Sequence, residues 1–139
     1  MRLVLDTNVV LSGLIRHGHP RRLLELAKEE AVSLYTSSAL PDELADVLSR
    51  EKWTAMLATR QTDAACLMQR YGVLAKVVRP KPIGRVVPND PDDDAVIACA
   101  LTARANLIVS GDKHLLGLGG QYQSISIVTP AEAVELIGR

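Results

Sequence analysis

Aromatic side chains are scarce in this sequence, which has no Phe, one Trp and three Tyr among 139 residues. The core must therefore be built from Leu, Val, Ile and Ala, which suits buried parallel strands covered by helices. Long apolar runs are also missing: no stretch reaches the roughly 20 residues of a membrane span, and the first residues do not resemble a signal peptide. We expect a single domain over residues 1–139, located in the cytoplasm and not in a membrane.

Cysteine content and net charge exclude further classes of protein. Cys66 and Cys99 have neither the spacing of a zinc site nor the number of a disulfide framework, so we expect two reduced, buried thiols. Sixteen basic residues balance sixteen acidic ones, so the chain lacks the excess positive charge of a protein that coats nucleic acid. Charge is nevertheless distributed unevenly: residues 70–85 contain basic residues and no acid, and four acids follow within residues 90–94.

Short apolar runs alternate with helical patterns along the chain. Strands are predicted at residues 3–5, 33–36, 77–78, 107–109 and 125–128. Helices are predicted at residues 8–16, 20–30, 51–58, 62–75 and 91–105, and from residue 130 onwards. A further helix is predicted to begin at a cap formed by Ser37 or Ser38 and to run through residue 48. Residues 80–91 carry four prolines and are expected to form an extended loop. This alternation predicts an α/β fold, a three-layer sandwich with a central parallel sheet of about five strands.

Four acids are placed by this topology near one edge of the predicted sheet. Asp6 and Asp112 each lie just past the carboxyl end of a strand, and Glu43 falls in the first turns of the helix after the second strand. Asp94 falls in the first turns of the helix that leads to the strand before Asp112. In such folds ligands bind outside the carboxyl ends of the strands. Each acid alone is also typical of a turn, a helix cap or a solvated helix face.

A convergence of acids requires an explanation, because two carboxylates about 4 Å apart repel each other by roughly 4 kcal/mol at an effective dielectric constant near 20. A bridging cation removes this repulsion. Oxygen ligands without cysteine favour Mg²⁺ or Mn²⁺ over Zn²⁺. A carboxylate-bound metal beside basic residues suggests the cleavage of phosphodiester bonds.

The motifs taken together resemble the PIN domain family, named for the PilT N-terminus. Residues 3–9 resemble the strand and Asp-Thr-Asn start of that family, and residues 40–44 resemble its helix acid. Residues 92–98 resemble its D-x-x-I-A helix start, and residues 108–113 its T-x-D strand end, with Ser110 in the Thr position. The resemblance covers about residues 3–128.

This resemblance implies a metal-dependent ribonuclease with Mg²⁺ or Mn²⁺ as its cofactor. The implied residues are the catalytic acids Asp6, Glu43, Asp94 and Asp112, of which Asp6, Asp94 and Asp112 bind the metal, with Asn8 and Ser110 as polar support. Within the family the chain is similar to VapC-like toxins of toxin–antitoxin pairs, which implies RNA as the substrate, a small antitoxin as partner, and a homodimer. Many relatives carry an acid where this chain has His114, so the presence of a second metal stays open.

Two basic clusters are candidates for contacts with RNA phosphates. They are Arg16, Arg21 and Arg22 after the first predicted helix, and Arg79, Lys81 and Arg85 in the proline-rich loop. An alternative function is a non-catalytic PIN scaffold that binds RNA or a protein partner. A phosphoacceptor signalling domain needs an acid pair after the first strand and an acceptor Asp after the third. This sequence has the single Asp6 after the first predicted strand and no acid from residue 64 to residue 89, so it is less compatible with that function.

Overall fold

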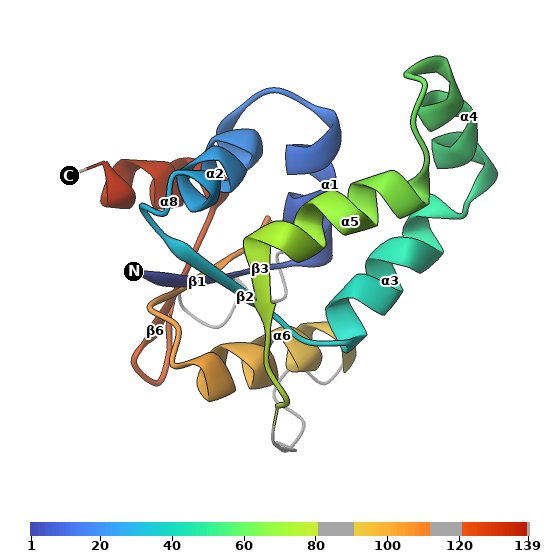
Figure 1. The fold of residues 1–139 in the computed structure, drawn as a ribbon. Coiled ribbons are helices and arrows are strands. Elements are labelled where there is room, and N and C mark those ends of the chain that lie inside the picture. Colours follow the sequence, from blue (N-terminus) through green and yellow to red (C-terminus); the bar gives the residue numbers. More distant parts are fainter. Residues whose placement is uncertain (81–90, 112–120, 139) are drawn as a thin grey trace.

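The computed structural model describes residues 1–80, 91–111 and 121–138, which form a six-stranded sheet covered by helices (Figure 1). The strands are β1 (Arg2–Leu5), β2 (Ser33–Thr36), β3 (Ala75–Val77), β4 (Leu107–Val109), β5 (Gln121–Tyr122) and β6 (Ile125–Val128). The helices are α1 (Thr7–Ile15), α2 (His19–Lys28), α3 (Ala39–Leu48), α4 (Glu51–Thr59), α5 (Ala64–Leu74), α6 (Pro91–Ala103) and α8 (Pro130–Ile137).

The strands are arranged in the order β3-β2-β1-β4-β6-β5, and all neighbours are parallel except β5 and β6. β1 lies between β2 and β4, where Leu3 is opposite both Leu34 and Leu107. Because these strands run in the same direction, their carboxyl ends lie at one edge of the sheet. We call this the carboxyl edge, and the last strand residues there are Leu5, Thr36 and Val109.

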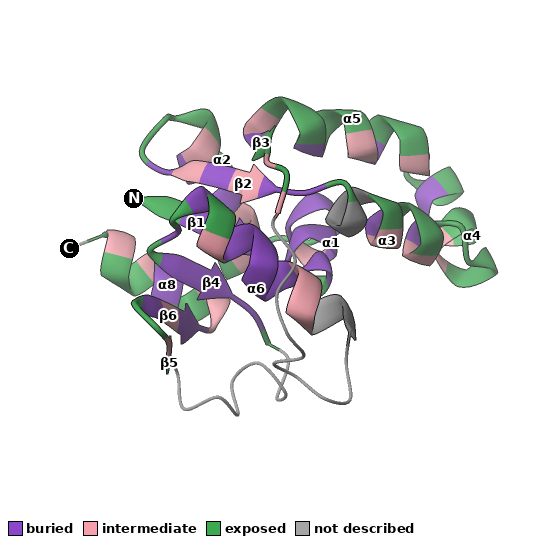
Figure 2. Cartoon of the chain, turned by 90° about the horizontal axis from the view of Figure 1, so that it is seen from below, coloured by how far each residue is buried: buried purple, intermediate pink, exposed green. Residues whose placement is uncertain are grey.

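Helices cover both faces of the sheet and produce three layers. On one face α1, α2, α5 and α8 pack over a core that includes Leu3 and Leu5, here called the α1-side core. On the other face α6 packs over a second core that includes Val4, Ile97 and Ile108, here called the α6-side core. The two sets alternate along each strand, as the pleat of a β-strand requires. Figure 2 shows the α6 face, with the central strands buried behind the helix.

Side-chain caps that are visible in the sequence begin three of the described helices. Asp6 and Asp63 cap α1 and α5 through their side chains, and Thr129 forms the predicted capping box with Glu132 at the start of α8. Ser38 occupies the cap position of α3, as one of the two predicted residues, but its side chain makes no capping hydrogen bond.

The predicted fold class is confirmed, and the differences concern edge elements and one thiol. β5 was not predicted, because two residues are too few to show an apolar pattern. β3 begins two residues earlier than predicted. Both thiols are free, but Cys66 is exposed on α5 and only Cys99 is buried, so the prediction of two buried thiols is wrong for Cys66. None of the helices in the described part of the chain is long and apolar enough to cross a membrane.

Candidate functional site

Asp6 is buried at the centre of the carboxyl edge and is held from two sides. Its backbone N–H donates to the carbonyl of Val109 at 3.1 Å, which extends the β1–β4 ladder by one residue. Its Oδ1 accepts a hydrogen bond of 2.9 Å from the backbone N–H of Val9, in the first turn of α1. Its Oδ2 accepts a hydrogen bond from the hydroxyl of Ser110. These contacts fix the orientation of the carboxylate.

Ser110 is the residue directly after β4 and is fully buried. Its backbone N–H donates to the carbonyl of Val128 at 2.9 Å, so the position of Ser110 is set by the sheet. The structure thus brings together Ser110 and Asp6, which are 104 residues apart in the sequence.

Glu43 reaches the same place from α3. Its Oε2 accepts a 2.8 Å hydrogen bond from the hydroxyl of Thr7, the buried first residue of α1. Thr7 directly follows Asp6, so one short segment of chain positions two acids. Sequence reasoning missed Thr7, although it stands inside the Asp-Thr-Asn motif. Its hydroxyl reaches another acid only after α3 has packed against α1.

Asp94 reaches the carboxyl edge from the opposite face of the sheet. The far end of α6 is anchored at the start of β1, where the Arg2 guanidinium donates to the carbonyl of Ala103 at 3.4 Å. From Ala103 back to Asp94 the helix rises about 13 Å, and from Arg2 to Asp6 the strand advances about 13 Å. These lengths place Asp94, which is partly buried, toward the end of α6 that is nearer the carboxyl edge.

The donors brought to this edge are carboxylate and hydroxyl oxygens, the ligand chemistry that Mg²⁺ and Mn²⁺ prefer. Within residues 1–80, 91–111 and 121–138, no three His, Cys, Asp or Glu side chains lie close enough together to hold a metal ion. The predicted ligand Asp112 lies outside the described residues, as does His114. Asn8, predicted as polar support, lies on α1 and is exposed.

The first basic cluster lies away from these acids. α1 has nine residues, so its last turn is about 13 Å from the carboxyl edge. Arg16, directly after that turn, is exposed. The Arg21 guanidinium donates to the carbonyls of Gly13 and Leu14 at 3.3 and 3.2 Å. The guanidinium of Arg22 pairs with Glu25 and Glu29 at 3.3 and 3.5 Å.

The second basic cluster begins at the carboxyl edge. Arg79 is exposed two residues after β3, which is separated from β1 only by β2. Lys81 and Arg85 lie outside the described residues. Six basic residues were predicted to contact RNA. Among those that the structure describes, Arg79 is the one on the same edge of the sheet as Asp6.

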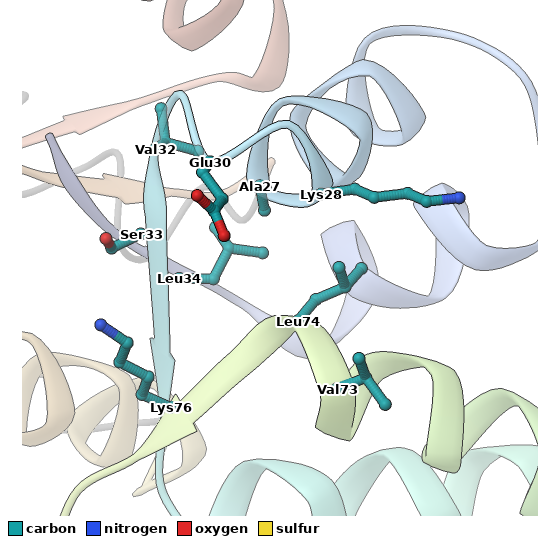
Figure 3. Close-up of a pocket in the computed structure, with 9 residues that line it drawn as sticks. All are labelled: Ala27, Lys28, Glu30, Val32, Ser33, Leu34, Val73, Leu74 and Lys76. Carbon is teal, nitrogen blue, oxygen red and sulfur yellow. The ribbon is translucent and has the colours of Figure 1, made fainter.

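A cavity of about 510 Å³ lies at the amino ends of β2 and β3, away from the carboxyl edge (Figure 3). It is lined by residues from the end of α2, the start of β2, the end of α5 and β3, among them Ser33, Leu34 and Val73. Lys28 and Lys76 also line it and point away from each other. No predicted site residue lines this cavity.

Comparison with known proteins agrees with this architecture. The fold is similar to a chain in the crystal structure of VapBC2 from Rickettsia felis bound to a DNA fragment from their promoter, with a TM-score of 0.59 and 15% sequence identity. The match covers 91% of this chain and 97% of that chain. At this identity the likeness concerns the fold alone. No curated protein gives a significant match.

The sequence itself carries the family assignment. A family model described as PIN domain matches residues 2–114. The matched range includes the Asp6–Ser110 and Thr7–Glu43 pairs together with Asp94. The chain therefore belongs to the PIN domain family.

Proposed function

We propose that this protein is a metal-dependent endoribonuclease that hydrolyses RNA phosphodiester bonds as the toxin of a toxin–antitoxin pair. The observation that carries the proposal is the buried Asp6 carboxylate, which is oriented by Ser110 and by the first turn of α1. Proteins of this family are in general metal-dependent nucleases. An oriented carboxylate at the centre of the carboxyl edge is suited to binding a cation.

The proposed roles follow from the positions of Asp6, Glu43 and Asp94 and, for Asp112, from the resemblance to the family. Asp6, Asp94 and Asp112 bind Mg²⁺ or Mn²⁺, and Glu43, oriented by Thr7, is the fourth catalytic acid. A bound divalent cation supplies charge neutralisation and an activated water molecule. The hydroxyls of Ser110 and Thr7 keep the carboxylates in place without neutralising their charge. Asn8, exposed beside them, is proposed to contact the cation's water shell or the substrate.

The RNA is proposed to run along the carboxyl edge and over Arg79. Lys81 and Arg85 follow Arg79 closely in the sequence, and we propose that they contact the same strand. Arg16 is an exposed candidate for a more distant contact. Arg21 and Arg22 already have partners within the chain, so we expect them to contribute less to RNA affinity.

The partners are proposed from the family and from the solved complex. A VapBC2 chain shares this fold, which supports a small antitoxin as the partner of this chain. A homodimer located in the cytoplasm is proposed on the same resemblance. The alternative, a non-catalytic scaffold that binds RNA or a protein, rests on His114, which stands where the resemblance to the family implies an acid.

Replacement of one carboxylate tests the catalytic proposal. We expect Asp6→Asn to lower Mn²⁺-dependent cleavage of single-stranded RNA by about 100-fold or more, a typical loss for a group that stabilises transition-state charge. Asn still accepts a hydrogen bond at a helix cap, so the melting temperature in EDTA should not fall.

The matched control is Asp42→Asn, because Asp42 is an exposed acid beside Glu43 and should be dispensable. Cleavage by Asp6→Asn at the wild-type rate would refute the catalytic role of Asp6. Metal-independent RNA binding by a wild-type protein that does not cleave would favour the scaffold.

A further inference from the structure

Ser37 is a buried hydroxyl that neither the sequence motifs nor the acid contacts explain. It is the first residue after β2, and only 2% of its surface is exposed. Its Oγ has no hydrogen-bond partner in the part of the chain that the structure describes. Buried polar atoms in native proteins nearly always have a protein or water partner, so an unsatisfied one suggests a bound group.

The strand register places Ser37 beside the acid site. Val4 is opposite Tyr35 in the β1–β2 pair, and Leu5 is opposite Val109 in the β1–β4 pair. Continued to the ends of the strands, this register puts Asp6 between Ser37 and Ser110 in one row. Neighbouring strands are about 4.8 Å apart, so Ser37 lies within reach of a group bound at Asp6.

The alternation of side chains indicates which face Ser37 occupies. Tyr35 packs against the α6-side core. Thr36 faces the other side, where it lies beside Tyr71 of α5. Ser37, the next residue, is therefore on the α6 side of the sheet, the side on which the helix that carries Asp94 packs.

We propose that the Ser37 hydroxyl binds a water molecule of the hydrated divalent cation held by the acids. This inference rests on the proposed function. Mg²⁺ and Mn²⁺ sites with few protein ligands retain several water molecules, and these need hydrogen-bond partners. Ser110 already donates to Asp6 and Thr7 to Glu43, whereas Ser37 is neither exposed to solvent nor bonded to the described part of the chain.

Mn²⁺ binding to the full-length protein, measured by calorimetry, tests the proposal independently of RNA cleavage. We expect Ser37→Ala to weaken Mn²⁺ binding by about 3- to 10-fold, the loss associated with one hydrogen bond. In EDTA the same variant should melt at or above the wild-type temperature, because it removes an unsatisfied buried group. Ser37→Cys keeps the volume of the side chain and should show the same weakening if Ser37→Ala folds poorly.

The control is Ser38→Ala, since Ser38 is exposed and its side chain does not cap α3. It should leave the Mn²⁺ affinity unchanged. Wild-type affinity in both Ser37 variants would overturn the role of Ser37. A wild-type protein that fails to bind Mn²⁺, or an Asp6→Asn variant that binds it equally well, would instead refute the proposed function on which this role rests.

Discussion

Alcohol side chains orient the acids of the candidate site. Ser110 donates to Asp6, and Thr7 donates to Glu43 at 2.8 Å. A hydroxyl orients a carboxylate but brings no positive charge, in contrast to Lys or Arg. These two contacts therefore orient the carboxylates of Asp6 and Glu43 without neutralising their charge.

Removal of the Thr7 hydroxyl tests this orienting contact at the level of stability. Thr7→Val keeps the shape of the side chain but cannot donate to Glu43. We expect the free energy of unfolding in urea to fall by about 1–2 kcal/mol, near the lower limit for a hydrogen bond to a charged group, because Glu43 is partly exposed. Thr7→Ser keeps the donor and should lose less. A Thr7→Val variant with the wild-type free energy of unfolding would contradict a stabilising role of this contact.

The first helix is secured at both ends by side chains from other parts of the chain. Asp6 caps its start. At its end, the Arg21 guanidinium donates to the carbonyls of Gly13 and Leu14, and the Arg60 guanidinium, directly after α4, donates to the carbonyl of Ile15. Because α1 carries Asp6 and Thr7 at its start, these contacts also stabilise the position of the site.

Gly13 allows α1 and α2 to pack closely. A Cβ atom added there would lie 2.9 Å from Leu24 Cδ1 and 3.0 Å from the carbonyl oxygen of Pro20. Overpacking costs about 1–3 kcal/mol, and the better helix propensity of Ala returns at most about 1 kcal/mol. We therefore expect Gly13→Ala to lower the free energy of unfolding by about 1 kcal/mol.

Gly72 in α5 provides the matched comparison. No heavy atom lies within 4 Å of a Cβ added there. Gly72→Ala should therefore raise the free energy of unfolding by up to about 1 kcal/mol through helix propensity alone. Melting temperatures that shift in the same direction for both variants would contradict the assigned packing role of Gly13.

The elements that could be predicted from the sequence are those with local causes. The strands at 33–36, 107–109 and 125–128 were predicted with the bounds that the structure has, because β-branched and other apolar residues cluster there between polar turn residues. Asp6 and Glu43 were identified because each follows a predicted strand. Thr7 and Ser37 were missed, because their importance depends on packing between α1 and α3 and on strand register, neither of which leaves a local pattern.

The folded molecule buries two weakly acidic groups, a thiol and a phenol, which lose their protons more easily in the unfolded chain than in the folded one. Burial raises the pKa of the Cys99 thiol from its ordinary value of 9.0 to about 12. Burial also raises the pKa of the Tyr71 hydroxyl well above its ordinary value of 10.0. In both cases the unfolded chain ionises first as the pH rises, so alkali favours unfolding.

Alkaline unfolding should therefore be steep and dependent on Cys99. Between pH 9 and 12 one thiol contributes a loss of about 1.4 kcal/mol of stability per pH unit. Between pH 9 and 10, below the ordinary pKa of Tyr71, the Cys99→Ala variant should show a clearly flatter decrease in urea midpoint than the wild type. Cys66→Ala is the control, because Cys66 is exposed and should leave the slope unchanged. Equal slopes in all three proteins would contradict the pKa shift of Cys99.

The pairing of β1 with β4 has a consequence for the order of events in folding. It joins Leu3 to Leu107, so a loop of about a hundred residues closes when the two strands meet. Parallel pairs of such long sequence separation form slowly, because the entropy of loop closure must be overcome before any contact compensates for it. A chain in which these strands have not yet met can already contain α1 with its Asp6 cap, but it lacks the Ser110 contact. The candidate site is thus assembled late, and its chemistry can begin only after the centre of the sheet is complete.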